Sequence, residues 1–393
     1  MAAMSDIEIP ESFRGRPYAE RHFRQIVQWA SAHSPFYRHF HAGGGVLPLL
    51  TREILQAHNE ELLNGLPVTG KTSGATSVPV RVHWGAPRSR LDHKDNLSYA
   101  GWYGGVLPHA KIVALSAHEK KDNSFEVASP VSQQLDFLRA RIRIHGAKSL
   151  ISYPTNLVQL AQHLRQDGQT IPELERLVCM SELFEASQEA CIAEAFPNAR
   201  IAATYSCTET GMIAGRCPHN PDNYHIMAHK LGVEFLNADG RPCAEGEVGQ
   251  IVITDYFNRA MPFIRYAIGD LAAPVRCECG KIELPALTRL LGKQRGLLRH
   301  PDGHYVFSTE LSPHIRDSIE VRQYQVIQHA PTRFLLRVIA RDGADAAAFE
   351  VRMRELFTLH FGVTTELVFD WCADIPRLPG GKYMEFVGLK DPA

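Results

Sequence analysis

The sequence lacks the features that mark several specialised classes of protein. Across its 393 residues, 42 Lys and Arg balance 43 Asp and Glu, so no excess of one charge indicates a nucleic-acid-binding face or an acidic tail. It has no apolar run of the roughly 18 residues that a membrane-spanning helix needs. The opening residues, MAAMSDIEIPESFRGRP, contain no signal-peptide core. We therefore expect a cytoplasmic protein that binds neither nucleic acid nor a membrane.

Cysteine is also sparse. Eight cysteines in a chain of this length are too few for a disulfide scaffold, which favours a reducing compartment. Apolar sequence, in contrast, is plentiful. A hydrophobic content of 45% is enough to build packed cores in two or three domains. Composition thus predicts a globular protein of enzyme size, without indicating its chemistry.

Apolar periodicity predicts helices first and then an alternation of strands and helices. Helical spacing predicts amphipathic helices over residues 18–42 and 51–64, the second with Thr51 as its N-cap. Buried strands, with helices between and after them, are predicted over residues 110–117, 147–154, 174–181 and 199–206. This alternation predicts an α/β core with parallel strands.

Beyond residue 230 the pattern changes. Short strands punctuated by Asp239-Gly240 and Gly246 predict an antiparallel, barrel-like section. Residues 324–371 then predict two strands, a helix and a further strand. We therefore expect an α/β fold with a large N-terminal domain of several subdomains and mixed sheets, residues 1–291, and a small α+β C-terminal domain, residues 292–393.

Two phosphate-binding patterns overlap in one stretch. Residues 65–72, GLPVTGKT, match the P-loop pattern, which binds phosphate between a buried strand and a helix N-terminus. Both flanks are wrong for a P-loop, because a helix is predicted before the stretch and a strand, residues 78–84, after it. Residues 72–79, TSGATSVP, offer hydroxyls and a glycine that suit the wrapping of ATP phosphates, but also a polar surface turn. We interpret the P-loop match as a coincidence.

Three further motifs lie downstream, at residues 204–211 (TYSCTETG), 261–271 (MPFIRYAIGDL) and 375–383 (IPRLPGGKY). Together with SGATSVP they resemble, in order, the signatures of the adenylate-forming (acyl-activating) superfamily, in particular its phenylacetate–CoA ligase branch. The N-terminal helices, with the stretch LPLLTREIL at residues 47–55, also resemble that branch. The resemblance covers nearly the whole chain.

The resemblance implies an ATP-dependent ligase. A carboxylic acid would attack the α-phosphate of ATP, release pyrophosphate and become an acyl-adenylate, with ATP and Mg²⁺ as cofactors. CoA, a carrier-protein thiol or an amine would then accept the acyl group, and the small C-terminal domain would act as a mobile lid. The sequence leaves a homodimer open. The expected walls of the acid pocket are mostly apolar or small, which suits an aromatic or small hydrophobic acid, and they are Tyr153, Ser181, Glu182 and Ala203.

The resemblance also assigns roles at the phosphates. Ser73, Gly74 and Thr76 would hold the β- and γ-phosphates of ATP. Thr208 would donate to the α-phosphate, and Glu209 would hold Mg²⁺. These residue types fit the chemistry, because a hard Mg²⁺ ion prefers carboxylate and phosphate oxygens.

Roles at the nucleoside and the acyl group follow from the same resemblance. Tyr205 would stack on adenine, and Asp270 would bind the two ribose hydroxyls. Lys382, next to two glycines, would bridge the acyl oxygen and the α-phosphate as a movable point charge. Lys293 stands where relatives carry a ribose-contacting arginine, whose planar fork a lysine cannot reproduce.

The hinge between the two expected domains departs from the pattern of its relatives. Residues 292–296 read GKQRG, where relatives read G-R-x-D-D. This departure leaves the thioester step open. Two alternatives to acyl transfer follow: a nucleotidyltransferase that leaves AMP on a small molecule, and a degenerate homologue that only binds the nucleotide.

Two turn-rich loops contain a candidate metal-binding set. Cys217 and His225 lie in one loop, and Cys277 and Cys279 in the other. Three thiolates and an imidazole form a stable tetrahedral zinc set, which would be structural because no ligand position stays open. Either His219 or His229 could replace His225, and four unlinked side chains are the other interpretation.

Overall fold

The structure is a computed structural model that describes residues 7–72, 79–117, 122–293, 298–303, 305–306, 308–362, 365–377 and 383–389. The chain divides into two units, Met1–Leu290 and Leu291–Ala393. Each unit has a hydrophobic core of its own. Among the described residues, no helix combines the length and apolar character needed to cross a bilayer.

The N-terminal helices form where the sequence predicts them, but each is broken in two. Their bounds are α1 Pro17–His33, α2 Pro35–Phe40, α3 Arg52–Ala57 and α4 Asn59–Leu63, with a 3₁₀ turn, η2 Glu11–Phe13, before them. The first break falls at Pro35, which ends the preceding helix and starts the next. Thr51 is the N-cap of α3, as predicted, because its hydroxyl accepts a hydrogen bond from the Ile54 amide at 3.4 Å.

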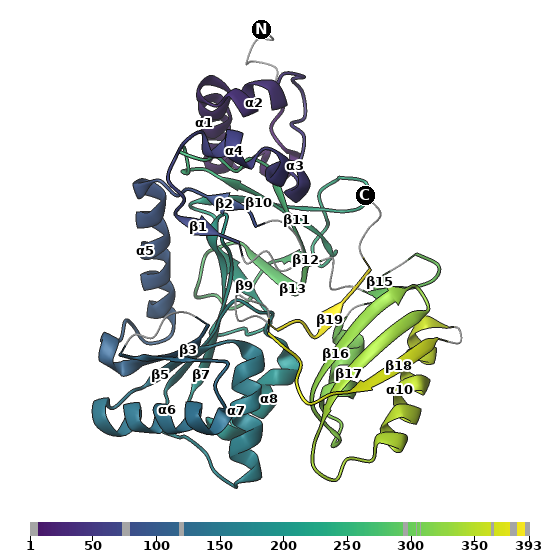
Figure 1. The fold of residues 1–393 in the computed structure, drawn as a ribbon. Coiled ribbons are helices and arrows are strands. Elements are labelled where there is room, and N and C mark those ends of the chain that lie inside the picture. The colour runs from purple at the N-terminus through teal and green to yellow at the C-terminus, as the bar shows by residue number, and fades with distance from the viewer. Residues whose placement is uncertain are drawn as a thin grey trace. The chain divides into compact units, whose positions relative to one another are not determined.

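A parallel sheet with helices between its strands forms one half of the first unit (Figure 1). The alternation predicts this arrangement, and the register of the strand pairs confirms it. The strands are β3 Ile112–Ser116, β4 Ser124–Glu126, β5 Ser149–Ser152, β6 Arg176–Cys179 and β7 Arg200–Cys207. The helices are α6 Val131–His145, α7 Pro154–Gln166 and α8 Ala186–Ala195, and a 3₁₀ turn, η3 His109–Lys111, precedes β3.

The antiparallel section continues the same sheet. Its strands are β8 Gly211–Arg216, β9 Tyr224–Ile226, β10 Leu231–Leu236, β11 Gly249–Asp255, β12 Tyr266–Val275 and β13 Ala286–Lys293. The full order is β10-β11-β12-β13-β9-β8-β7-β6-β5-β3-β4, so the direction of the chain first reverses at the β7–β8 turn. Side chains of β7 and β12 touch although β8, β9 and β13 separate them in this order, so the antiparallel part is strongly curved.

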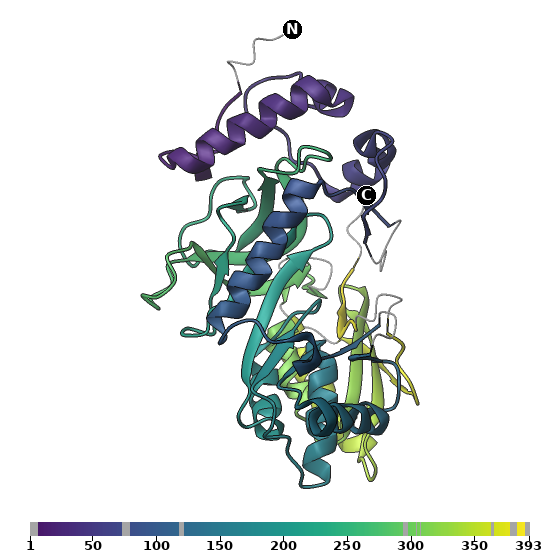
Figure 2. The same ribbon diagram turned by 90° about the vertical axis from the view of Figure 1, so that its left-hand side faces the viewer.

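Two further elements lie at the hydroxyl-rich stretch and after it. The strands β1 Gly70–Lys71 and β2 Arg81–Val82 form a short antiparallel hairpin, so the strand expected over residues 78–84 is only two residues long. The helix α4 precedes residues 65–72, and the next element after them is the strand β2, which is not the environment of a P-loop. Helix α5, Ala86–Trp102, has no counterpart among the predicted elements and packs against β8 (Figure 2).

The second unit is a small α+β unit with the predicted order of strand, strand, helix and strand. Its sheet has the order β18-β17-β16-β19, formed by β16 Val321–Ala330, β17 Arg333–Ala340, β18 Glu366–Trp371 and β19 Phe386–Val387. The remaining elements are β14 Leu298–Arg299, β15 Tyr305–Val306, α9 Ser308–Arg316 and α10 Ala346–Phe361. Four α10 residues at helical spacing enter its core: Phe349, Met353, Phe357 and Phe361.

Candidate active site

The turn between β7 and β8 carries a buried carboxylate, that of Glu209. Its side chain is 5% exposed, and its Oε1 accepts hydrogen bonds from the Tyr266 hydroxyl at 2.8 Å and from Arg52 Nη1 at 3.2 Å. Arg52 also donates from Nη2 to Thr72 Oγ1 at 3.1 Å. Residues from α3, β12 and the end of β1 therefore meet at one carboxylate. Burial and the nearby Glu209 charge raise the pKa of Tyr266, so its phenol stays a proton donor.

The hydroxyl-rich stretch begins beside this carboxylate. The Thr72 amide donates to the Val80 carbonyl at 2.9 Å, which closes the β1–β2 hairpin across the stretch. A Cβ atom on Gly70 would lie 3.2 Å from Thr208 Cγ2, so the hairpin packs directly on the β7–β8 turn. Ser73, Gly74 and Thr76 themselves lie outside the described residues. The hairpin on either side of the stretch thus packs on Thr208, and Thr72, its first residue, is linked to Glu209 through Arg52.

A second buried carboxylate, Asp270 on β12, faces β7. The Tyr205 hydroxyl donates to Asp270 Oδ2 at 2.7 Å, and both residues are less than one tenth exposed. Burial, with the adjacent Asp270 charge, raises the pKa of Tyr205 well above its usual value, so the phenol remains a donor at neutral pH. Asp270 and Tyr266, the partner of Glu209, both lie on β12, with an irregular register between them. The charges of Asp270 and Glu209 both add to burial in raising the pKa of Tyr205, so the two carboxylates lie near the same phenol, and each is held by a tyrosine.

Besides Ser73, Gly74 and Thr76, two candidate residues have no described side chain at this site. Lys382 lies outside the described residues, and for Lys293 only the main chain, at the end of β13, is described. Arg52 and Tyr266, in contrast, received no role from the sequence although both contact Glu209. They lie within stretches that carry the family resemblance. Their contacts span 157 and 57 residues of the chain, a separation that no sequence pattern reveals.

The predicted acid-pocket residues lie near the ends of β5, β6 and β7. Tyr153 is the buried N-cap residue of α7, and Glu182 Oε2 accepts from the Thr155 amide at 3.1 Å and from its hydroxyl at 2.7 Å. Glu182 therefore interacts with the first turn of α7, where a carboxylate is favoured. Ser181 has a positive φ of 66°, and Ala203 is buried in β7. That these residues line an acid pocket stays a prediction.

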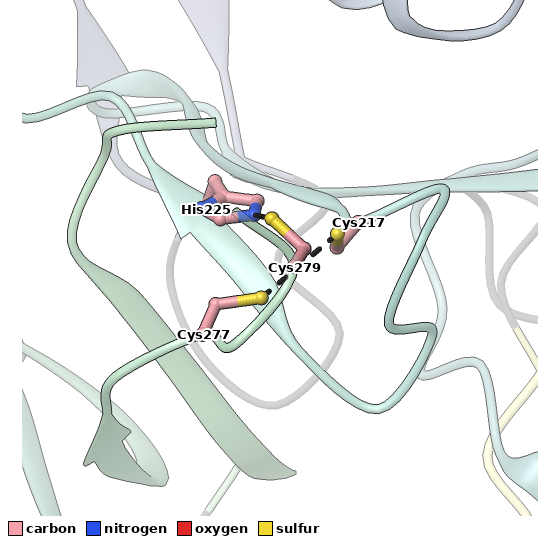
Figure 3. A group of neighbouring side chains, drawn as sticks. All are labelled: Cys217, His225, Cys277 and Cys279. Carbon is pink, nitrogen blue, oxygen red and sulfur yellow. Dashed lines mark hydrogen bonds between the residues drawn. The ribbon is translucent and has the colours of Figure 1, made fainter. Parts of the chain in front are cut away.

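A cluster of four potential metal ligands lies at the antiparallel end of the first unit (Figure 3). One ligand atom from each of the four residues lies within 4.8 Å of all the others, and the residues are Cys217, His225, Cys277 and Cys279. The structure thereby selects His225 over its two alternatives: His229 pairs with Asp95 at 2.6 Å, and His219 contributes only its amide to the Cys217 sulfur.

Two of the separations within the cluster match those around a tetrahedral zinc ion. Zinc–ligand bonds of about 2.3 Å to sulfur and about 2.05 Å to nitrogen imply ligand separations of roughly 3.8 Å for S–S and roughly 3.6 Å for S–N. The observed separations are 3.9 Å between the Cys217 and Cys277 sulfurs and 3.6 Å between Cys279 Sγ and His225 Nε2. His225 Nδ1 lies 3.1 Å from the Leu284 carbonyl oxygen, which orients Nε2 toward the thiols. Burial lowers the pKa of His225, which favours the neutral ring that binds metals.

Comparison with known proteins gives two curated relatives. No protein-family model matches the sequence. Protein CapK of Staphylococcus aureus is 24% identical over 143 residues, which cover 35% of this chain and 31% of CapK. A phenylacetate-coenzyme A ligase of Thermus thermophilus is 27% identical over 154 residues, which cover 38% of this chain and 32% of that enzyme. Each match thus spans about a third of the relative's length.

Solved structures resemble the chain over more of its length. A 2-hydroxyisobutyryl-CoA ligase in its postadenylation state, bound to an AMP adduct, is 17% identical with a TM-score of 0.74, covering 98% of this chain and 90% of that one. The amide bond synthetase McbA of Marinactinospora thermotolerans is 17% identical with a TM-score of 0.56, covering 79% and 65%. The chain therefore has the fold of the adenylate-forming ligases, as predicted. The match to a phenylacetate-coenzyme A ligase confirms the resemblance to that branch.

Proposed function

We propose that this protein activates a carboxylic acid with ATP, releases pyrophosphate and forms an acyl-adenylate. One observation carries the proposal: on the fold of adenylate-forming ligases, two tyrosine-held carboxylates, Glu209 and Asp270, lie near the same phenol, Tyr205, and Arg52 joins Glu209 to the start of a hydroxyl-rich stretch. These are the residue types that a magnesium–nucleotide complex requires.

The described residues suit the chemistry of adenylation. Two anions, the acid and the α-phosphate, must approach each other, so positive and hydrogen-bonding groups must face the developing charge. Thr208 donates to the α-phosphate, and Glu209 holds Mg²⁺, which when bound neutralises phosphate charge. Arg52, already between Glu209 and Thr72, adds a positive charge at the start of the hydroxyl-rich stretch. Ser73, Gly74 and Thr76 hold the β- and γ-phosphates.

The remaining nucleotide and acyl contacts complete the proposal. Tyr205 stacks on adenine while its hydroxyl orients Asp270, which binds the ribose hydroxyls. Lys293 contacts the ribose, and Lys382 bridges the acyl oxygen and the α-phosphate. The acid is aromatic or small and hydrophobic, and it lies against Tyr153, Ser181, Glu182 and Ala203.

CoA is the proposed acyl acceptor. The 2-hydroxyisobutyryl-CoA ligase that shares this fold has been solved with both an AMP adduct and CoA. A carrier-protein thiol and an amine are the alternatives, and McbA, an amide bond synthetase, shares the fold as well. Residues 1–291 form the adenylation domain, and residues 292–393 form a lid that moves between the two steps.

We also propose a structural zinc ion at Cys217, His225, Cys277 and Cys279. The cluster joins the end of β8 and β9 to the loop after β12, so zinc would hold together two loops of the curved sheet. None of the eight cysteines, each of which the structure describes, forms a disulfide. A cytoplasmic location stays a prediction. A homodimer stays a prediction.

The test is pyrophosphate release by the purified full chain, with ATP, Mg²⁺ and a panel of carboxylic acids. Acid-dependent release of pyrophosphate, with hydroxamate formed when hydroxylamine is added, is the expected result. Glu209→Gln should reduce this release at least about 100-fold, since it removes a metal ligand. Formation of a stable AMP–substrate product without acyl transfer would favour the nucleotidyltransferase alternative. ATP binding without pyrophosphate release for any acid would favour the degenerate homologue.

A further inference from the structure

Helix α5 presents a polar face to the interior of the protein. Of its seventeen residues, Arg88, Asp95 and Tyr99 are buried, and Arg88 is completely inaccessible. A helix that packs on a sheet usually buries an apolar stripe instead. The buried charges of α5 therefore need an explanation, which their contacts provide.

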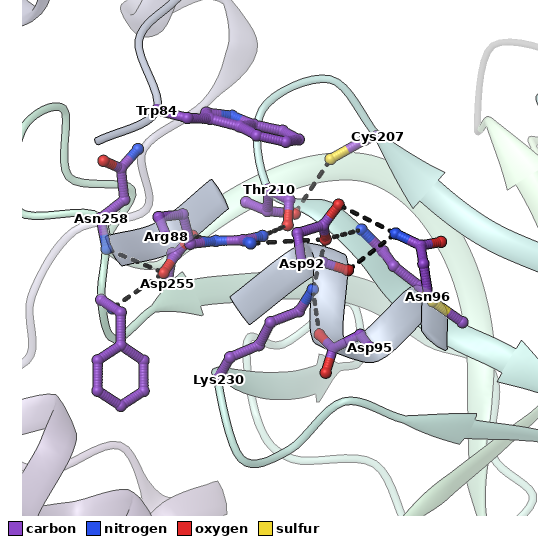
Figure 4. A network of polar contacts seen from close by, with 12 residues as sticks. Trp84, Arg88, Asp92, Asp95, Asn96, Cys207, Thr210, Lys230, Asp255 and Asn258 are labelled. Carbon is purple, nitrogen blue, oxygen red and sulfur yellow. Dashed lines mark hydrogen bonds and ion pairs between the residues drawn. The ribbon is translucent and has the colours of Figure 1, made fainter. Parts of the chain in front are cut away.

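Three side chains from Trp84 to Asp92 hold the main chain of the β7–β8 turn, and Figure 4 shows two of them, Arg88 and Asp92, beside Thr210. Trp84 Nε1 donates to the Glu209 carbonyl oxygen at 3.2 Å. Arg88 Nη2 donates to the Thr210 carbonyl oxygen, and Asp92 Oδ1 accepts from the Met212 amide at 2.9 Å. The backbone is thus fixed at Glu209 itself and on its C-terminal side.

The approach of Asp92 to the turn is close enough to require glycine. Gly211 has a φ of +66°, and a Cβ atom on it would lie 2.4 Å from Asp92 Oδ1 and 3.0 Å from Arg88 Nη2. Any larger residue would displace the Asp92 carboxylate or the turn. The conformation of the turn and the position of Asp92 therefore depend on each other.

A buried network of ion pairs supports this contact. Arg88 Nε lies 2.5 Å from Asp255 Oδ2, and Lys230 Nζ lies 2.7 Å from Asp92 Oδ1 and 2.6 Å from Asp95 Oδ2. His229 pairs with Asp95 from the same loop as Lys230. Burial alone would raise the pKa of Asp92. Lys230, the Met212 amide and Arg88 together hold it below its usual value, so the carboxylate is ionised.

Stability alone does not account for this network. Moving such charges out of water is costly, and apolar residues of similar volume often replace buried ion pairs without loss of stability. What the charges provide is a fixed geometry, because Arg88 and Asp92 form directional hydrogen bonds with the main chain at the turn. A metal-binding carboxylate needs its position held to within about 0.5 Å.

We propose that Trp84, Arg88 and Asp92 are positioning residues that hold the Thr208–Glu209 turn in the conformation that binds the magnesium–nucleotide complex. This inference rests on the proposed function, which assigns the α-phosphate to Thr208 and Mg²⁺ to Glu209. Trp84 also links the turn to the β1–β2 hairpin, because its amide donates to Oγ1 of Thr69, the residue before β1, at 2.8 Å.

The experiment measures nucleotide binding by the full chain over a series of Mg²⁺ concentrations without any acid, by titration calorimetry with ATP. Trp84→Phe keeps an aromatic ring over Arg88 but removes the N–H donor to the Glu209 carbonyl. We expect the half-saturating Mg²⁺ concentration to rise about fivefold, the worth of one hydrogen bond, while the melting temperature falls by only a few degrees. Asp92→Asn should raise it further, because it removes the charge opposite Lys230. Arg90→Met, an exposed change on the same helix, is the matched control.

The outcomes separate this inference from the proposed function. Wild-type dependence on Mg²⁺ in both Trp84→Phe and Asp92→Asn, even with a lowered melting temperature, would reduce the network to a structural role and overturn the inference alone. A wild-type protein that binds no ATP at any Mg²⁺ concentration would overturn both. Once the acid is known, the variants should raise the KM for ATP more than they lower kcat, which a general loss of folded protein would not do.

Discussion

The role of Asp270 can be tested by changing the nucleotide as well as the protein. The change to the nucleotide removes one ribose hydroxyl. If the Asp270 carboxylate accepts hydrogen bonds from both ribose hydroxyls, 2′-deoxy-ATP loses one of the two and should bind more weakly than ATP. Asp270→Asn keeps the shape of the side chain but removes its charge, so the variant should discriminate poorly between the two nucleotides. The two changes together form a double-mutant cycle between the protein and its ligand.

The expected size of the effect follows from the environment of Asp270. Hydrogen bonds to charged groups contribute about 1.5–3 kcal/mol, which corresponds to roughly 10- to 150-fold in affinity. Asp270 is only 7% exposed, so water screens its hydrogen bonds weakly. The Tyr205 hydroxyl holds Asp270 Oδ2 at 2.7 Å, so the carboxylate needs little rearrangement to bind the ribose. We therefore expect the wild-type protein to bind ATP at least about 30-fold more tightly than 2′-deoxy-ATP. The Asp270→Asn variant should prefer ATP by less than about threefold.

Calorimetric titration of each protein with each nucleotide, at saturating Mg²⁺, gives the four affinities. Tyr205→Phe is an intermediate case, because it leaves the carboxylate in place but removes the donor that orients it. Asp136→Asn, an exposed change of the same chemistry on α6, serves as the control and should behave as wild type. Equal affinity of the wild-type protein for ATP and 2′-deoxy-ATP would refute the assignment. So would full discrimination retained in Asp270→Asn.

Three further predictions concern the lysine, the metal and the N-terminal helices. Lys382→Ala should lower acid-dependent exchange of pyrophosphate into ATP at least about 100-fold while ATP still binds, and undiminished exchange would remove Lys382 from its role. Metal analysis should find about one zinc ion per chain. Cys279→Ser should lose both the zinc and thermal stability, whereas Cys243→Ser, the control, should keep both. A zinc-free wild-type protein would contradict the site. Burial lowers the pKa of His41 from 6.5 to about 4. As the pH falls, the unfolded chain therefore takes up a proton before the folded protein does. Stability that is present above pH 6.5 is then lost as the pH falls toward 4. His41→Gln should remove about 3 kcal/mol of this pH dependence, measured by denaturant unfolding against wild type, and parallel pH profiles would refute it.

The sequence by itself determined the elements whose buried residues are apolar. Parallel strands such as β5 and β6, and helix α10 with its repeated aromatic residues, carry the periodicity that burial imposes on neighbouring positions. The cap of α3 at Thr51 and the order of the nucleotide motifs are equally local. The fold class therefore followed from patterns that extend over fewer than about twenty residues.

Helix α5 shows where such reasoning ends. Its buried face carries Arg88 and Asp95 instead of apolar residues, so it has no amphipathic signature, and no local pattern predicts it. The contacts that assemble the site are of the same kind. Tyr205 meets Asp270 across 65 residues, and Arg52 meets Glu209 across 157.

The choice among three histidines for the metal cluster, and the engagement of Glu182 with α7, were also decided only by the tertiary structure. An apolar side chain can be buried against any apolar neighbours, because it needs no specific partner. The spacing of apolar residues along the sequence is therefore enough to predict its burial. A buried polar or charged group needs a particular partner at a particular angle, and only the folded chain brings that partner to it.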